Sequence, residues 1–233
     1  MDGKNIQVDS AINLNFDNLV PDQHCMDNNN LYYSTRNRGR CILLDYLADV
    51  RSQSTVRLLQ STFGKLNYQF ECYRGWNDRQ TLQLLNQGLE DESFDSLIVL
   101  ILTTSCRKVI ECANRTRINS HIIVNKLNGK FCKPFAGKPK VIMIQEYCNK
   151  LASDGPTIDQ HHQYMIPSHA DMLIYTYRGK SQLFWPTLCS TLVTKTTDSL
   201  DLVKQLTMVT KCIHQQTGII TEMFSTLIKL FRI

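Results

Sequence analysis

Cys148 is the residue most able to do chemistry, because it follows a buried apolar run in the stretch FAGKPKVIMIQEYCN at 135–149. A cysteine acts as a nucleophile only when a nearby base or cation favours its thiolate form. No histidine lies between His24 and His121 to supply that base in the preceding strands. Side chains of an extended chain alternate between faces, so Tyr147 and Cys148 are expected to point to opposite sides. We therefore interpret Cys148 as a thiol at the end of a strand and not as a nucleophile.

The remaining cysteines suggest neither a disulfide framework nor a metal centre. The chain has nine cysteines, an odd number, and they are scattered without a C-x-x-C pair. The first residues, MDGKNIQVDS, lack the zones of a signal peptide. We expect reduced thiols, no metal, no cofactor and a cytoplasmic location.

Charge and hydropathy exclude two classes of partner. The formal charge of +5 is mild, and basic residues are spread along the chain apart from a short run at 36–40. No aromatic and basic interleaving indicates nucleic-acid binding. The apolar run at 97–102 is too short to cross a bilayer. We expect no nucleic acid and no membrane as partners.

The elements that must position Cys148 alternate between strands and helices. Apolar runs predict buried strands, and apolar residues at a spacing of three or four predict helices. Strands are expected at 41–47, 68–73, 96–103, 140–146, 172–177 and 223–231, and helices at 54–66, 77–90, 119–130, 183–195 and 198–214. Such alternation predicts an α/β sandwich with a mostly parallel sheet. The Asn- and Asp-rich residues 1–38 predict a flexible leader, and 149–169 predicts an exposed linker.

Several motifs resemble those of the caspase family. The turn FAGKPK at 135–140, followed by Ile144 and Gln145, is similar to the strand that delivers the caspase cysteine. Further matches keep the family's order: Gly39-x-Cys41, Asp95-Ser96, Cys132, the stretch IPSHAD at 166–171, Leu188-Cys189 and Ser225-x-Leu227-x-Lys229. The resemblance covers about 39–233. It implies a six-stranded sheet, with a large-subunit-like part at 39–150, a linker at 151–170 and a small-subunit-like part at 171–233.

The resemblance ends at the catalytic residues. The position of the family's cysteine holds Tyr147, that of its histidine holds Thr104, and Ser105 replaces the glycine that helps to bind the oxyanion. The resemblance therefore implies a catalytically inactive pseudo-caspase, similar to the decoy caspases of insects. Of the substrate pocket, Gln145 remains, whereas Arg51 only approximates the family's arginine. The loop that holds substrate is shortened to 178–181, without a Ser-Trp-Arg motif.

An inactive homologue that keeps the last strand can still pair with an active one. Caspases dimerise through that strand, so the resemblance implies a heterodimer with an active caspase paralogue, or a homodimer, and a role in regulating apoptosis. The expected interface comprises Met223, Phe224, Ser225, Thr226, Leu227, Ile228 and Lys229. Asp154 and Asp159 are candidate cleavage sites.

Other interpretations remain open at this point. The chain could be a cysteine protease with a rearranged active site, or an inhibitor that sequesters a caspase without activating it. It could also be a structural or redox protein that uses its thiols. Finally, it could be a monomer whose last strand is covered by its own leader.

Overall fold

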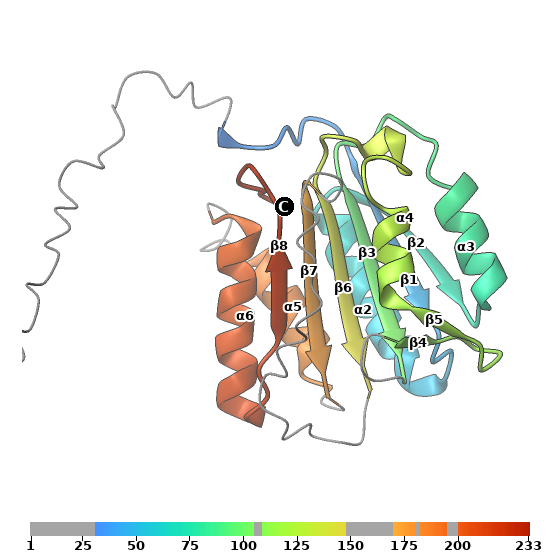
Figure 1. Ribbon diagram of the computed structural model, residues 1–233. Coiled ribbons are helices and arrows are strands. Elements are labelled where there is room, and N and C mark those ends of the chain that lie inside the picture. The colour runs from blue at the N-terminus through green and yellow to red at the C-terminus, as the bar shows by residue number, and fades with distance from the viewer. Residues whose placement is uncertain (1–30, 105–108, 148–169, 180–181, 195–199) are drawn as a thin grey trace, which may run out of the picture.

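The computed structural model describes residues 31–104, 109–147, 170–179, 182–194 and 200–233. Their centre is a six-stranded sheet in the order β2-β1-β3-β6-β7-β8. Its strands are β1 (Gly39–Asp45), β2 (Tyr68–Arg74), β3 (Leu97–Thr103), β6 (Lys140–Glu146), β7 (Met172–Arg178) and β8 (Glu222–Ser225). All neighbours run parallel except β8, which is antiparallel to β7. The predicted α/β sandwich with a mostly parallel sheet is confirmed (Figure 1).

Helices cover both faces of this sheet. One face packs against α2 (Val50–Lys65), α5 (Phe184–Val193) and α6 (Leu202–Thr217). The other face packs against α3 (Asp78–Gln87), α4 (Ser120–Lys126) and the hairpin of β4 (Val109–Glu111) and β5 (Arg117–Asn119). Because alternate side chains of a strand point to opposite faces, β3 contributes Ile98, Leu100 and Leu102 to one core and Leu97, Val99 and Ile101 to the other.

The helices begin where the sequence supplies caps. Asn77 starts α3 with a capping box, in which its side chain accepts from the Gln80 amide and the Gln80 side chain accepts from the Asn77 amide. Asp49 caps α2 by accepting from the Ser52 amide, and Asp201 caps α6 by accepting from the Lys204 amide. Each of these three helices thus begins at an Asn or Asp whose side chain satisfies an amide of the first turn.

The helix predicted over 119–130 is shorter than expected. It ends at Lys126, and the β4–β5 hairpin before it was not predicted. The physical reason lies at Asn128, whose side chain accepts hydrogen bonds from the amides of Lys130 and Phe131. Asparagine competes with helical backbone bonds in this way, so the chain turns into the short 3₁₀ helix η2 (Lys133–Phe135).

The strand predicted over 223–231 is wrong in its second half, because β8 ends at Ser225. Thr226 still bonds to the start of β7, with its amide donating to the Met172 carbonyl at 2.8 Å. Beyond it, Leu230 forms a parallel bridge with Tyr32 instead of extending the sheet edge. Of the seven expected interface residues, only Met223, Phe224 and Ser225 lie in the strand.

The end of the expected leader is part of the packed body. Tyr33 is 8% exposed and belongs to the core beside β7 and the C-terminus. Its amide donates to the Leu230 carbonyl, and the Leu230 amide donates to the Leu31 carbonyl. The packed chain thus begins before Gly39, since an aromatic ring and two backbone bonds hold 31–33. Residues 1–30 lie outside the described part of the chain.

Candidate functional site

The candidate site lies where β3 and β6 end side by side. Thr103 and Glu146 are register partners, and the Tyr147 amide donates to the Thr103 carbonyl at 2.8 Å. Thr104 and Tyr147 therefore leave neighbouring strands at the same edge. Ligands of open α/β sheets bind outside these carboxyl ends. The fold thus brings together the two positions that sequence comparison with caspases singled out.

These two positions carry hydroxyl groups where the family has a histidine and a cysteine. Thr104 is exposed, whereas Tyr147 is half-buried and packs against the core of the face that α2, α5 and α6 cover. A threonine hydroxyl does not titrate near neutral pH, and a phenol has an ordinary pKa of about 10. Neither group is suited to take a proton from a nucleophile at neutral pH.

Ion pairs link β6, β7 and β8 at this edge of the sheet. The Arg178 guanidinium donates to the Glu146 carboxylate at 2.8 Å and also contacts the Glu222 carboxylate. The Glu146 side chain is 3% exposed and the Arg178 side chain 28%. Burial alone would lower the pKa of Arg178, but its bonds to the two carboxylates raise it above its ordinary value. Arg178 is thus engaged by the carboxylates of Glu146 and Glu222.

Backbone hydrogen bonding between the β6 and β7 segments also continues past the ends of both strands. The Gly179 amide donates to the Glu146 carbonyl at 3.0 Å, continuing the β6–β7 ladder beyond both strands. A Cβ on Gly179 would lie 2.7 Å from the Tyr177 hydroxyl. Only glycine fits this close approach. The shortened loop therefore begins directly against the strand end.

Gln145, the residue retained from the family's substrate pocket, is placed unfavourably for binding. Gln145 is fully buried in β6, between its register partners Leu102 and Tyr177. Predictions for Ser105, Cys148, Asp154 and Asp159, and for the side chain of Arg51, lie outside the described part of the chain.

A polar cluster that the sequence analysis missed lies at the ends of β1 and β2. The fully buried Asp45 carboxylate accepts from the Ser52 hydroxyl at 2.8 Å and from Arg74 at 2.9 Å. It also accepts from the Ala48 amide at 3.0 Å, which holds Ala48 at a φ of 46°. The signal was an aspartate at the end of the apolar run CILLD. Its bonds hold the β1–α2 turn and tie the end of β1 to the end of β2, so the cluster is structural.

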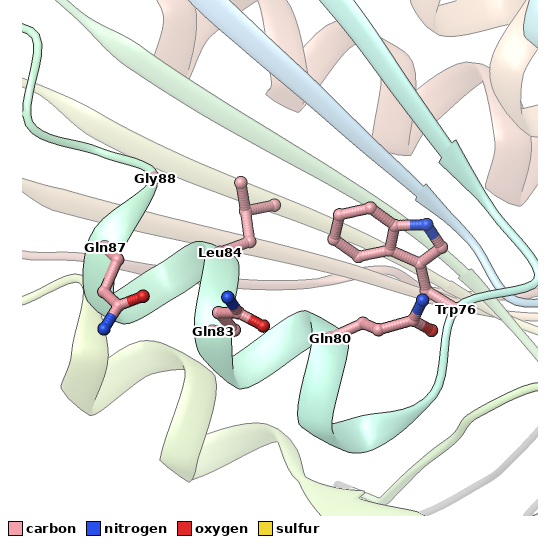
Figure 2. A pocket seen from close by; sticks show the side chains of 6 residues that line it. All are labelled: Trp76, Gln80, Gln83, Leu84, Gln87 and Gly88. Atoms are coloured by element: carbon pink, nitrogen blue, oxygen red, sulfur yellow. The ribbon is translucent and has the colours of Figure 1, made fainter.

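A groove of about 440 Å³ lies apart from these strand ends, along α3. Trp76 lies at one end and Gln87 and Gly88 at the other, with Gln80, Gln83 and Leu84 between them (Figure 2). No residue of β3, β6 or β7 lines it. The groove therefore plays no part in the site at Thr104 and Tyr147.

The described residues offer no metal site and few reactive thiols. No group of three or more His, Cys, Asp or Glu side chains among them could hold a metal ion. Burial raises the pKa of Cys41, of Cys132 and of Cys189, the last to about 11. These thiols remain protonated at neutral pH. Within the described ranges, no helix is long and apolar enough to cross a membrane.

Comparison with known proteins agrees with this fold. The family model for the caspase domain matches residues 46–217, which is more than half of the chain. The chain therefore belongs to the caspase-domain family. No curated protein sequence matches it.

Solved insect structures share the fold. The structure of pro-sf-caspase-1 superposes with a TM-score of 0.73 at 20% identity, covering 89% of this chain and 95% of that chain. The crystal structure of caspase-1 from Spodoptera frugiperda gives a TM-score of 0.70 at 20% identity, covering 88% and 94%. At this identity the likeness concerns the fold and not the activity.

Proposed function

We propose that this chain is a non-catalytic caspase homologue that regulates an active caspase paralogue by forming a heterodimer with it. The observation that carries the proposal is the pair of residues at the strand ends, Thr104 and Tyr147. They adjoin the paired residues Thr103 and Glu146, where the family resemblance places a histidine and a cysteine. Without a thiolate and its base, a caspase-type acyl transfer has neither nucleophile nor proton acceptor.

The last strand supports the pairing step of the proposal. β8 is the outer strand of the sheet, and every residue in it is exposed. Met223 is 39% exposed and Phe224 55%. An uncovered apolar edge is a template for pairing with another chain, and a similar paralogue can satisfy an isologous contact. We propose that the partner binds along Glu222–Ser225, a shorter edge than the interface over 223–229 that the sequence predicted.

Two outcomes for the partner follow from the same contact. Docking activates the partner if it favours the partner's ordered loops, because a contact shifts an equilibrium by its differential affinity for the two states. Docking sequesters the partner if the pair cannot order those loops. On our proposal, either result modulates apoptosis, and the pairing takes place in the cytoplasm.

Co-expression with candidate active caspases tests the proposal. The purified complex is assayed for cleavage of an aspartyl reporter, beside the active caspase alone and this chain alone. We expect a 1:1 complex with altered activity and no cleavage by this chain alone. Labelling of this chain alone by an aspartyl electrophile would contradict the proposal and favour a rearranged protease.

The expectation for the linker stays a prediction. Asp154 and Asp159 are candidate cut sites for an active partner, and they lie outside the described residues. We propose that regulation does not require this cleavage. Replacing both residues with alanine is expected to leave the effect on the partner unchanged.

A further inference from the structure

An exposed aromatic residue surrounded by lysines lies beyond the end of α4. Phe131 is 59% exposed, and the ammonium groups of Lys126 and Lys130 lie 5.5 Å and 5.8 Å from its ring centroid. Ile122, which is 43% exposed, precedes Lys126 by four residues and therefore lies on the same side of α4. Lys133 follows and is exposed. We call these five residues the Phe131 patch.

The patch has an unbalanced positive charge. Residues 112–145 contain no aspartate or glutamate, although they hold two arginines and five lysines. Arg117 reaches back to Glu111, and Lys138 and Lys140 donate to backbone carbonyls. Lys126, Lys130 and Lys133 form no ion pair with any described residue. The patch thus combines an apolar centre with cations that have no ion-pair partner in the described part of the chain. This composition fits an acidic segment with bulky apolar side chains.

The chain itself contains such a segment. Residues 1–30 hold five aspartates and one lysine, whereas the rest of the chain is strongly basic. Within them the stretch INLNFDNLVPD at 12–22 places Asp17 and Asp22 beside Phe16, Leu19 and Val20. Its charge and apolar side chains complement those of the Phe131 patch.

The start of the described chain lies within reach of the patch. The Tyr33 hydroxyl bonds to the Asp171 carboxylate, and the Asp171 carbonyl accepts from the Lys140 amide. The Lys140 ammonium in turn donates to the Phe135 carbonyl at 2.9 Å, two residues from Lys133. In Figure 1, the segment leading into β1 and the turn after α4 lie at the same end of the sheet. The eight residues between Asp22 and Leu31 can span roughly 30 Å when extended.

We propose that residues 12–22 dock on the Phe131 patch of the same molecule. The aspartates meet the lysines while an apolar side chain covers Phe131 and Ile122. The assignment is independent of the proposed pairing through β8. It gives the acidic leader an intramolecular binding surface, for which another acidic segment would have to compete.

Carbodiimide coupling of the full chain tests the proposal, because it joins carboxylates to amines only where they touch. Equal amounts of unlabelled and ¹⁵N-labelled chain are mixed at low concentration. A link within one molecule then joins two labelled or two unlabelled peptides, whereas a link between molecules also joins a labelled peptide to an unlabelled one. We expect links from Asp17 or Asp22 to Lys126, Lys130 or Lys133, and few to the exposed Lys65 and Lys211. The yield should fall in high salt, since salt screens exposed charges.

Phe131→Ala supplies the second arm. It keeps every lysine, and we expect the link yield to fall about fivefold, the effect of truncating an interface aromatic residue. Met208→Ala removes a similarly exposed apolar side chain, 47% exposed, and should leave the yield unchanged. Links spread evenly over all exposed lysines, or a yield indifferent to Phe131→Ala, would overturn the proposal. Links found only between labelled and unlabelled chains would also overturn it, by assigning the patch to a second copy.

Discussion

The Tyr33 hydroxyl donates to the Asp171 carboxylate at 2.6 Å, across 138 positions of sequence. The same oxygen accepts from the Ile228 amide at 3.1 Å. Asp171 lies just before β7 in a left-handed conformation, with a φ of 63°, and its amide donates to the Thr226 carbonyl. The Tyr33 hydroxyl thus links the N-terminal segment both to the start of β7 and to the chain after β8.

Tyr33→Phe is expected to destabilise the fold by about 1–3 kcal/mol, because it leaves a buried carboxylate without its donor. The free energy of unfolding in urea measures the change. Tyr32→Phe is the matched control, since the Tyr32 hydroxyl bonds only to the exposed Arg232 among the described residues. Equal losses in the two variants would contradict this role for Tyr33.

Alkaline pH should destabilise the protein through its buried phenols. Burial and the bond to Asp171 raise the pKa of Tyr33 above its ordinary value, and burial with the Glu71 contact raises the pKa of Tyr73 to about 12. A pKa raised by folding gives stability that is complete below the unfolded value of about 10 and is lost as pH rises above it. Unfolding in urea from pH 8 to 11.5 should show a smaller loss in Tyr33→Phe than in the parent. Identical slopes would remove Tyr33 from this effect.

Arg178→Ala should destabilise the protein by about 2–4 kcal/mol, because it removes the arginine partner of the buried Glu146 carboxylate. Adding Glu146→Gln removes that charge, so the double variant should be more stable than Arg178→Ala alone. Glu222→Gln is the control, because the Glu222 side chain is 62% exposed and its loss should cost little. A double variant less stable than Arg178→Ala would show that the ion pair does not govern this edge.

Restoring the dyad should not restore activity. We expect Tyr147→Cys with Thr104→His to cleave no aspartyl reporter, because catalysis needs a positioned substrate as well as reactive groups. Arg178 is held by Glu146 and Glu222, and Gln145 is fully buried. Measurable turnover by the folded double variant would show that the substrate groove survives.

Phe224→Arg should abolish pairing with the partner while leaving the fold intact. It replaces an exposed apolar side chain of the outer strand with a charge. Met208→Arg, on the exposed side of α6, is the control and should leave the complex unchanged. Thr226→Pro would be less suitable, because the Thr226 amide is bonded to the Met172 carbonyl and proline cannot donate that bond. Co-purification of the Phe224→Arg variant with the partner would place the interface elsewhere.

Local patterns in the sequence were sufficient for the α/β architecture, and the resemblance to caspases singled out Thr104 and Tyr147, whose adjacency the sheet register then showed. Buried parallel strands leave continuous apolar runs such as LIVLIL, and residues after such strands meet at one edge of the sheet. The sequence pattern could not predict where β8 ends. The strand-like pattern of residues continues to Phe231, whereas the chain turns at Thr226. That turn is decided by Tyr33, Asp171 and Leu230, which are distant in sequence. The ion pair of Glu146 with Arg178 likewise depends on the β6–β7 register. The sequence shows that both residues are charged, but only the pairing of the two strands brings them together.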